Sequence, residues 1–273
     1  MPVIILIVVI FLVALFILGV RFRRQSVRNQ LKASEFKSEW ISILRKNIAL
    51  YNKLPESLRL RLHGLINVFL NEKAFSGYNG LEINDEIRVT IAAQACILLL
   101  NRESDFYPSL HNIYVYPGAF KSLQTTSDGL LHSVEETVRS GESWHRGHVV
   151  LSWSHSRQGG KDDDDGENVV YHEFAHQLDH ADGAIDGTPI LDSAEHYDSW
   201  SKIFSQEYAQ LRDKIRNNKK SLIDEYAAVS EGEFFAVVTE LFFEQPILFI
   251  KEHPELYAEL QKFYRLNPAE WFQ

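Results

Sequence analysis

The hydrophobic pattern of the chain begins with an uninterrupted apolar segment. Residues 2–20 carry only apolar side chains, glycine and proline, with no charged or polar side chain. In a helix that rises 1.5 Å per residue, this segment is about 28 Å long, close to the thickness of the hydrocarbon core of a bilayer. A buried helix of a soluble fold is the weaker interpretation of so long a run. We therefore assign residues 1–20 to a transmembrane anchor that contacts the lipid bilayer through residues 2–20.

Positive charge follows the apolar segment directly. Arg21, Arg23, Arg24 and Arg28 fall within eight positions. A cleaved secretory signal carries its positive charge before the apolar run, which is the opposite order. Arginine is enriched on the cytoplasmic side of membrane helices. We expect a single-pass protein of the inner (cytoplasmic) membrane, with residues 21–35 as a basic juxtamembrane linker and the remaining residues facing the cytoplasm.

Beyond the linker, apolar residues recur every three or four positions in several segments, which is typical of helices packed on a core. The pattern predicts helices from Ser38, over 58–69, over 87–100 and over 230–244. Two short segments rich in β-branched and aromatic residues, 113–116 and 148–153, are predicted strands. The expected fold class is α+β, mainly helical with a small sheet, in one domain over residues 36–273.

Composition narrows the functional classes. The chain of 273 residues has 45% hydrophobic and 24% charged residues, which is ordinary globular usage. A net charge of -9 argues against nucleic-acid binding, which requires a basic surface. The single cysteine, Cys96, excludes an intramolecular disulfide and a multi-cysteine zinc site. Any metal must therefore be bound by histidines and carboxylates.

Four consecutive aspartates, Asp162–Asp165, suggest a calcium loop at first sight. When Gly166 is aligned with the invariant glycine of an EF-hand, Lys161 takes the first ligand position and His172 takes the place of the closing glutamate. Neither residue suits calcium, so we interpret this segment as a solvated loop.

The pattern H-E-x-x-H occurs at His172, Glu173 and His176. Residues four apart project from one side of a helix, so both imidazoles can converge on one ion. The opposite side of this helix is apolar, which leaves the histidine side free for chemistry. That apolar side comprises Val170, Phe174, Leu178 and Ala181.

A catalytic zinc site also needs a third protein ligand and an open position for water. Asp179 lies on the histidine side, but three ligands over two turns of one helix span about 10 Å and close poorly on an ion. We interpret Asp179 as a carboxylate that orients a ligand or as a solvent-facing residue. Downstream, Glu233 and Glu240 lie one heptad apart on an otherwise apolar helix. Ser230 and Glu233 also match a capping box, so spacing alone leaves two explanations for Glu233.

These motifs resemble the Mlc titration factor A family of bacterial zinc peptidases, a glucose-regulated peptidase family. The likeness extends from Leu54 to Pro268 and is carried by residues 92–96, 149–153, 168–179 and 226–243. The metal motifs are also similar to the catalytic domain of anthrax lethal factor, which has a tyrosine seven residues before its ligand glutamate. The resemblance implies a zincin-like metallopeptidase domain over residues 36–273.

Carried over by position, the resemblance implies one Zn²⁺ per chain, held by His172, His176 and Glu233. It implies that Glu173 is the general base and that Tyr226 donates a hydrogen bond in the transition state. It further implies a peptide or protein substrate and a regulatory protein partner, a sugar-responsive transcriptional repressor. The membrane anchor and the aspartate-rich loop depart from the family pattern.

The expected function is that of a membrane-anchored metalloprotease, a hydrolase whose catalytic domain faces the cytoplasm. Metal-activated water would attack the peptide bond, with Glu173 as the base. We expect the strand over 148–153 to hold the substrate backbone by strand addition. The alternative is a membrane-tethered binding protein that sequesters a cytosolic regulator such as a transcriptional repressor. An intact Glu173 favours the enzyme, because a structural metal site needs no base. A zinc hydrolase that acts on other substrates stays open.

Overall fold

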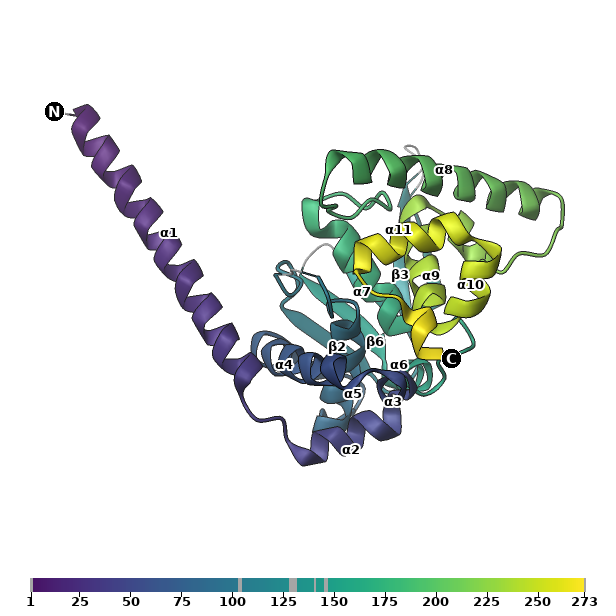
Figure 1. The fold of residues 1–273 in the computed structure, drawn as a ribbon, viewed down its shortest axis with the longest axis horizontal. Helices are drawn as coiled ribbons and strands as arrows, with labels where there is room; N and C mark the ends of the chain where they lie inside the picture. The colour runs from purple at the N-terminus through teal and green to yellow at the C-terminus, as the bar shows by residue number, and fades with distance from the viewer. Residues whose placement is uncertain (1, 103–104, 128–131, 140, 145–146, 273) are drawn as a thin grey trace.

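The computed structural model describes residues 2–102, 105–127, 132–139, 141–144 and 147–272, and these residues are mainly helical (Figure 1). The α-helices are α1 (Pro2–Ala33), α2 (Ser38–Asn47), α3 (Ala49–Lys53), α4 (Glu56–Glu72), α5 (Asp85–Ile97), α6 (Trp153–Lys161), α7 (Val169–Asp179), α8 (Ala194–Arg216), α9 (Glu231–Glu244), α10 (Pro246–Glu252) and α11 (Pro254–Tyr264). Short 3₁₀ helices are η1 (His180–Asp182), η2 (Glu225–Ala228) and η3 (Pro268–Phe272). The strands are β1 (Ala74–Gly77), β2 (Asn112–Tyr116), β3 (Phe120–Ser127), β4 (His132–Arg139), β5 (Gly141–Trp144) and β6 (His148–Ser152). The expectation of a mainly helical α+β fold with a small sheet is confirmed.

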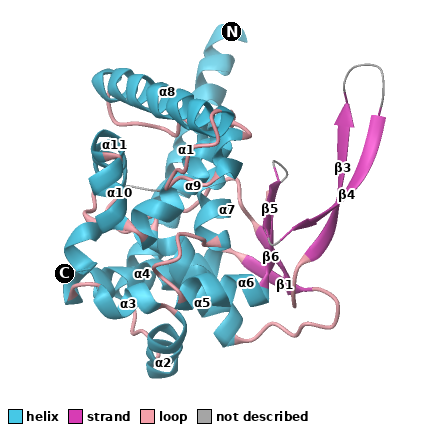
Figure 2. Cartoon of the chain, turned by 90° about the vertical axis from the view of Figure 1, so that its right-hand side faces the viewer, coloured by secondary structure: helices cyan, strands magenta, loops and turns pink. Residues whose placement is uncertain are grey.

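The sheet has four strands in the order β1-β2-β6-β5. The pairs β1–β2 and β2–β6 are parallel, whereas β5 and β6 are antiparallel. Strands β3 and β4 form a separate antiparallel hairpin that projects from the body of the molecule (Figure 2). Both predicted strands are confirmed, as β2 and β6; the second ends at Ser152 because Trp153 already begins α6.

Strand β6 lies inside the sheet. It pairs with β2 on one side and with β5 on the other, so both of its hydrogen-bonding edges are used. The expectation that residues 148–153 bind substrate by strand addition is therefore wrong. Among the described strands, β5 pairs only with β6, which makes β5 the edge of the sheet on this side.

Helix α7 lies in the interior, where it packs against α9, β5 and α5. Phe174 anchors it: its ring centroid lies 5.7 Å from that of Phe69 and 4.8 Å from that of Tyr107. The sequence suggested that the histidine side of this helix is free. In the structure α9 packs against α7, and only 9% of His176 is exposed. The helix that carries the H-E-x-x-H pattern is thus held in place on both sides.

Helix α1 extends away from the body as a straight rod (Figure 1). Its length and apolar composition are those of a membrane span, and its most apolar stretch is not buried against the rest of the protein. The segment 21–35, expected as a linker, continues the helix to Ala33 without a break. Arg28 fixes this part to the body through ion pairs of 2.6 Å with Glu72, on α4, and 2.6 Å with Asp105.

The aspartate-rich loop lies at the surface between α6 and α7. Asp163 forms an ion pair of 2.9 Å with Lys53. The side chain of Gln245 donates to the carbonyl of Asp164 at 2.6 Å. Asp164 and Asp165 are exposed, as expected for a solvated loop, and these contacts attach the loop to the neighbouring helices.

Candidate functional site

Local sequence sets the start and the end of the helix that carries the two histidines. The side chain of Asn168 caps α7 by accepting from the backbone N–H of Val170 and of Tyr171, both at 3.0 Å. Gly183 closes the following η1 turn with a φ of 101°, a left-handed conformation that suits glycine. Asn168 thus sets the start of α7, and Gly183 ends the turn that follows the helix.

A second cap positions Glu233. The Oγ of Ser230 accepts from the backbone N–H of Glu233 at 3.1 Å and starts helix α9. In a complete capping box the glutamate side chain would return to the backbone of Ser230. Here the Glu233 carboxylate instead lies at the histidines of α7. Capping therefore accounts for Ser230 but not for the position of the Glu233 carboxylate.

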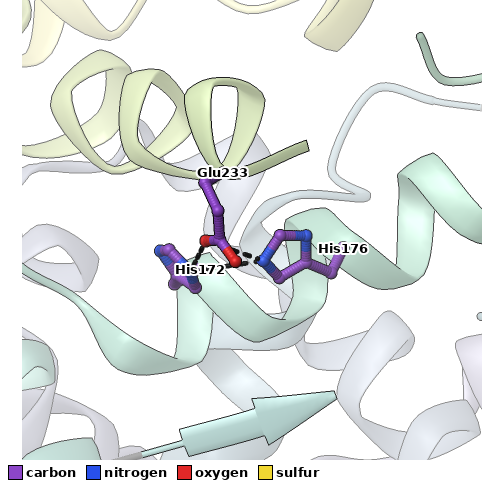
Figure 3. Close-up of side chains that lie close together, drawn as sticks. All are labelled: His172, His176 and Glu233. Atoms are coloured by element: carbon purple, nitrogen blue, oxygen red, sulfur yellow. Dashed lines mark hydrogen bonds and ion pairs between the residues drawn. The ribbon is translucent and has the colours of Figure 1, made fainter. Parts of the chain in front are cut away.

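Three side chains from two helices converge on one point (Figure 3). Oε2 of Glu233 lies 2.9 Å from Nε2 of His172 and 3.3 Å from Nε2 of His176, and the two Nε2 atoms are 3.3 Å apart. Donor atoms bound at about 2.1 Å to a tetrahedral ion of the size of zinc lie roughly 3.4 Å from one another. The three atoms thus have the spacing of a metal-binding triad, and all lie within 4.8 Å of one another.

A fourth residue, Glu240, orients the first histidine. Its Oε1 lies 2.8 Å from Nδ1 of His172, and its other oxygen accepts the backbone N–H of Asn168. A carboxylate bonded to Nδ1 directs Nε2 of the imidazole toward the triad. The sequence placed Glu240 one heptad after Glu233 on an apolar helix, but it did not reveal this partner.

The electrostatics of the site favour positive charge. Burial opposes a charged imidazole, yet the hydrogen bonds to Glu233 and Glu240 raise the pKa of His172 well above its usual value. Burial also opposes ionisation of Glu233, but the hydrogen bonds to both histidines keep its pKa far below the usual range. Desolvation raises the pKa of the buried Glu240. Carboxylates that surround two imidazoles form a site that a cation would neutralise.

Glu173 lies beside the triad on α7 and next to the edge strand. It is 5% exposed. Gly141, at the start of β5, packs so closely that an added Cβ would lie 2.6 Å from Oε1 of Glu173. A larger residue here would require the side chains of Val169 and Glu173 to shift, so the start of β5 lies against the Glu173 side chain.

Tyr226 approaches the site from the turn η2 before α9. Asp224 caps this turn by accepting the backbone N–H of Tyr226 at 2.8 Å. The phenol ring lies 6.0 Å from the ring of His172, centroid to centroid, and 48% of the residue is exposed. Tyr226 therefore flanks the triad at the solvent side rather than packing in the core.

Asp179 has neither of the two roles expected from the sequence. It is fully buried, which excludes a solvent-facing position. Its Oδ2 accepts the backbone N–H of Gly187 at 3.0 Å, so it fixes the loop after η1 instead of a histidine. Burial raises its pKa to about 6.

Comparisons with known proteins show the family of the chain. Residues 21–265 match the profile of the glucose-regulated metallo-peptidase M90 family. The chain belongs to the M90 metallopeptidase family. Membership implies a bound metal ion and a peptide substrate in general terms, and the triad is the part of the described structure whose donor atoms fit an ion.

Individual relatives cover most of the chain. An uncharacterized protein of Synechocystis sp. is 45% identical over 231 residues, which is 84% of each chain. Mlc titration factor A of Salmonella typhi is 30% identical over 231 residues, or 82% of this chain and 84% of the relative. Mlc titration factor A of Salmonella arizonae is also 30% identical, over 82% of this chain and 89% of its own. The family resemblance inferred from the motifs is thereby confirmed.

Proposed function

We propose that the protein is a membrane-anchored, zinc-dependent peptidase with one Zn²⁺ per chain. The convergence of His172, His176 and Glu233 within 4.8 Å is the observation that carries this proposal. Residues 36–273 would form the peptidase domain, residues 1–20 the anchor, and residues 21–35 the connection between them.

The donor set favours zinc over other common ions. Two imidazoles and one carboxylate match a catalytic zinc site, in which a fourth position stays open for water. Calcium and magnesium prefer sites made of oxygen atoms alone. Bound zinc would supply water with a pKa near 7 and would polarise the substrate carbonyl. Glu240 would hold His172 in the tautomer whose Nε2 faces the ion.

Glu173 would serve as the general base. It follows His172 directly on α7, so it is rotated by about 100° from that ligand and need not bind the ion itself. The carboxylate would accept the proton of the attacking water and return it to the leaving amine. Tyr226 would donate a hydrogen bond to the oxyanion from the solvent side of the site.

The edge of β5 would hold the substrate. An extended peptide can add to an edge strand through backbone hydrogen bonds. The edge of β5 starts at Gly141, whose backbone lies against Glu173. A peptide aligned there would pass close to Glu173. The edge of β5 would thus have the substrate-binding role that the sequence had assigned to residues 148–153.

The anchor would place the protein in the inner (cytoplasmic) membrane, with the catalytic domain in the cytoplasm. The support is the apolar, fully exposed segment of α1 and the arginines that follow it. Helix α1 continues into the domain and is fixed there by Arg28. The active site would therefore be held at a defined orientation near the membrane surface.

A second candidate function comes from the relatives' names. Mlc titration factor A is a name for proteins that titrate Mlc. By analogy, this protein would bind a cytosolic regulatory protein, such as a transcriptional repressor, at the membrane. The two functions differ at Glu173, because protein binding needs no general base.

The proposed peptidase activity can be tested with the full chain in a neutral detergent. We expect it to cleave members of a peptide library, to lose this activity with a zinc chelator, and to regain it with added Zn²⁺. Binding of a regulator without cleavage of any peptide, with zinc fully bound, would instead favour the second candidate.

A further inference from the structure

One side of helix α9 carries a row of acidic residues that extends beyond the triad. Glu233, Glu240 and Glu244 follow one another at intervals of seven and four positions, which places them on the same side of the helix. The first two contact the histidines of α7. Glu244, the last residue of α9, is 1% exposed and has no part in the proposed peptidase mechanism.

The carboxyl group of Glu244 is buried without the partners that it needs. Both of its oxygens lack a hydrogen bond among the described residues, and so does Nδ2 of the neighbouring Asn168. No lysine or arginine in the described part of the chain forms an ion pair with it. Buried charges in native proteins are paired or coordinate a metal ion. The burial of Glu244 therefore indicates a ligand from outside the chain.

The surroundings of this carboxyl group are negative. Burial raises the pKa of Glu244 well above its usual value, and the amide of Asn168 opposes this shift. The charges of Glu240 and Asp165 add to the rise, and the carboxyl groups of Asp165 and Glu244 are in direct contact. The last turn of α9 contains no basic residue, so the negative end of the helix dipole is not compensated there. All these charges favour a cation.

The aspartate-rich loop holds Asp165 against the end of α9. The side chain of Gln245 donates to the carbonyl of Asp164 at 2.6 Å, which attaches the loop to this end. Oδ1 of Asp165 accepts the backbone N–H of Glu167 at 2.9 Å. Asp165 is exposed whereas Glu244 is buried, so the two carboxyl groups extend from the solvent into the interior. A hydrated ion could reach this pair from the surface.

The donor set suits a hard divalent cation. The EF-hand register fails within the loop, but Glu244 supplies a carboxylate from α9 that the local sequence does not contain. The described residues contain one group of three donor side chains, which is the triad, so this pair would depend on water for its remaining ligands. Mg²⁺ is commonly bound through one or two carboxylates and keeps several waters, and Ca²⁺ also binds carboxylates and water.

We propose that Asp165 and Glu244 bind a hard divalent cation, Mg²⁺ or Ca²⁺, at a site distinct from the triad. The proposal does not depend on the peptidase activity or on the membrane anchor. A bound cation would neutralise Glu244 beside Asn168, which caps α7 and donates its backbone N–H to Glu240. The cation would thus stabilise the junction of α7 and α9, the two helices that carry the triad.

The test uses the full chain in neutral detergent, saturated with Zn²⁺ and freed of excess metal. Calorimetric titration with MgCl₂ and with CaCl₂ at constant ionic strength would identify the cation, and the zinc content would be measured before and after. We expect one Mg²⁺ or Ca²⁺ per chain with the zinc retained. No binding of either cation at millimolar concentration would overturn the proposal. Release of zinc in equal amount would also overturn it, because the added cation would then occupy the triad.

The variant Asp165→Asn removes one charge from an exposed position and keeps an oxygen that can accept the Glu167 N–H. It should weaken cation binding by about tenfold or more. The matched control is Glu167→Gln, which removes the same charge from an exposed side chain two positions away. It should change the affinity by less than about threefold. Equal weakening in both variants would overturn the proposal, since the attraction would then be diffuse.

A proton shared by Asp165 and Glu244 is the alternative to a cation, and thermal unfolding separates the two. A cation that binds only the folded chain raises the unfolding midpoint. We expect the bound cation to raise the midpoint of the parent but not that of Glu244→Gln or Asp165→Asn. A parental midpoint that does not respond to either cation would overturn the proposal in favour of the shared proton. An equal rise in all three proteins would place the cation elsewhere and overturn it as well.

Discussion

Oε1 of Glu240 lies 2.8 Å from Nδ1 of His172, although 68 positions separate the two residues in the sequence. The bond leaves Nε2 of His172 directed at Glu233 and His176. One carboxylate on α9 therefore orients an imidazole on α7, while a second carboxylate one heptad earlier completes the triad. The two helices act as one unit, and the site depends on their packing.

The first prediction concerns this orienting carboxylate. Glu240→Gln removes its charge but keeps its volume, so we expect metal affinity to fall about 10–100-fold. Competition with a chromogenic chelator would measure the affinity. Glu231→Gln, an exposed position on the same helix, is the control and should bind metal like the parent. Unchanged affinity in Glu240→Gln would mean that packing alone orients His172.

The second prediction separates the two possible explanations of Glu233. Glu233→Ala should reduce metal binding by more than the roughly 10–100-fold expected for a residue that only orients a ligand. Glu231→Ala should retain the metal, because its side chain is exposed at the start of α9. Metal content after dialysis, read by atomic emission, distinguishes them. An empty site in Glu231→Ala together with a full site in Glu233→Ala would show that the helix register is different.

The pH dependence of stability provides the third prediction. Burial alone would raise the pKa of Glu72, but hydrogen bonds from Arg28 and Arg24 lower it from 4.5 to about 2. A carboxyl group with a depressed pKa stabilises the fold above its unfolded pKa and loses this effect as the pH falls toward its folded pKa. The stabilisation by Glu72 should therefore be complete above pH 4.5 and decline between pH 4.5 and about 2.

Thermal unfolding of the full chain in detergent can check this dependence. The difference in midpoint between the parent and Glu72→Gln should shrink as the pH is lowered through this window. A difference that stays constant or grows toward low pH would show that Glu72 does not stabilise the contact between α1 and α4 through its charge.

The fourth prediction is topological. Arginines that follow an uncharged span favour retention on the inner side of the membrane. The C-terminal domain should therefore resist protease added to intact spheroplasts and be degraded once they are lysed, as detected by an antibody to that domain. Degradation in intact spheroplasts would place the active site outside, and a soluble fragment without residues 1–20 would remove the anchor from the account.

Local signals in the sequence predicted the helical parts of the site well. The i, i+4 spacing of His172 and His176 lies within one helix, so periodicity suffices to predict that both imidazoles share one side. Ser230 was likewise found as a cap. Ser230 also left the role of Glu233 open, because a glutamate three residues after a capping serine can complete a capping box or bind the metal.

Relationships between distant segments were not predictable in this way. The pair Glu240–His172 depends on how α7 packs against α9, which no local pattern encodes. Strand β5 begins with glycine and carries glutamate and serine, residues that are uncommon in strands, so the sequence did not predict it. Without β5, the strand over 148–153 was expected to have an open edge that could bind substrate. Asp179 was assigned to the histidine side by helical phase alone, yet the loop at Gly187 supplies its partner.

The most direct test of the central claim is the rate of peptide hydrolysis by Glu173→Gln, measured with its zinc content. The amide cannot accept the proton of the attacking water, and it leaves His172, His176 and Glu233 intact. We predict a variant that binds zinc like the parent and hydrolyses peptides at least about a hundredfold more slowly. Hydrolysis at the parental rate with a full metal site would contradict the catalytic account.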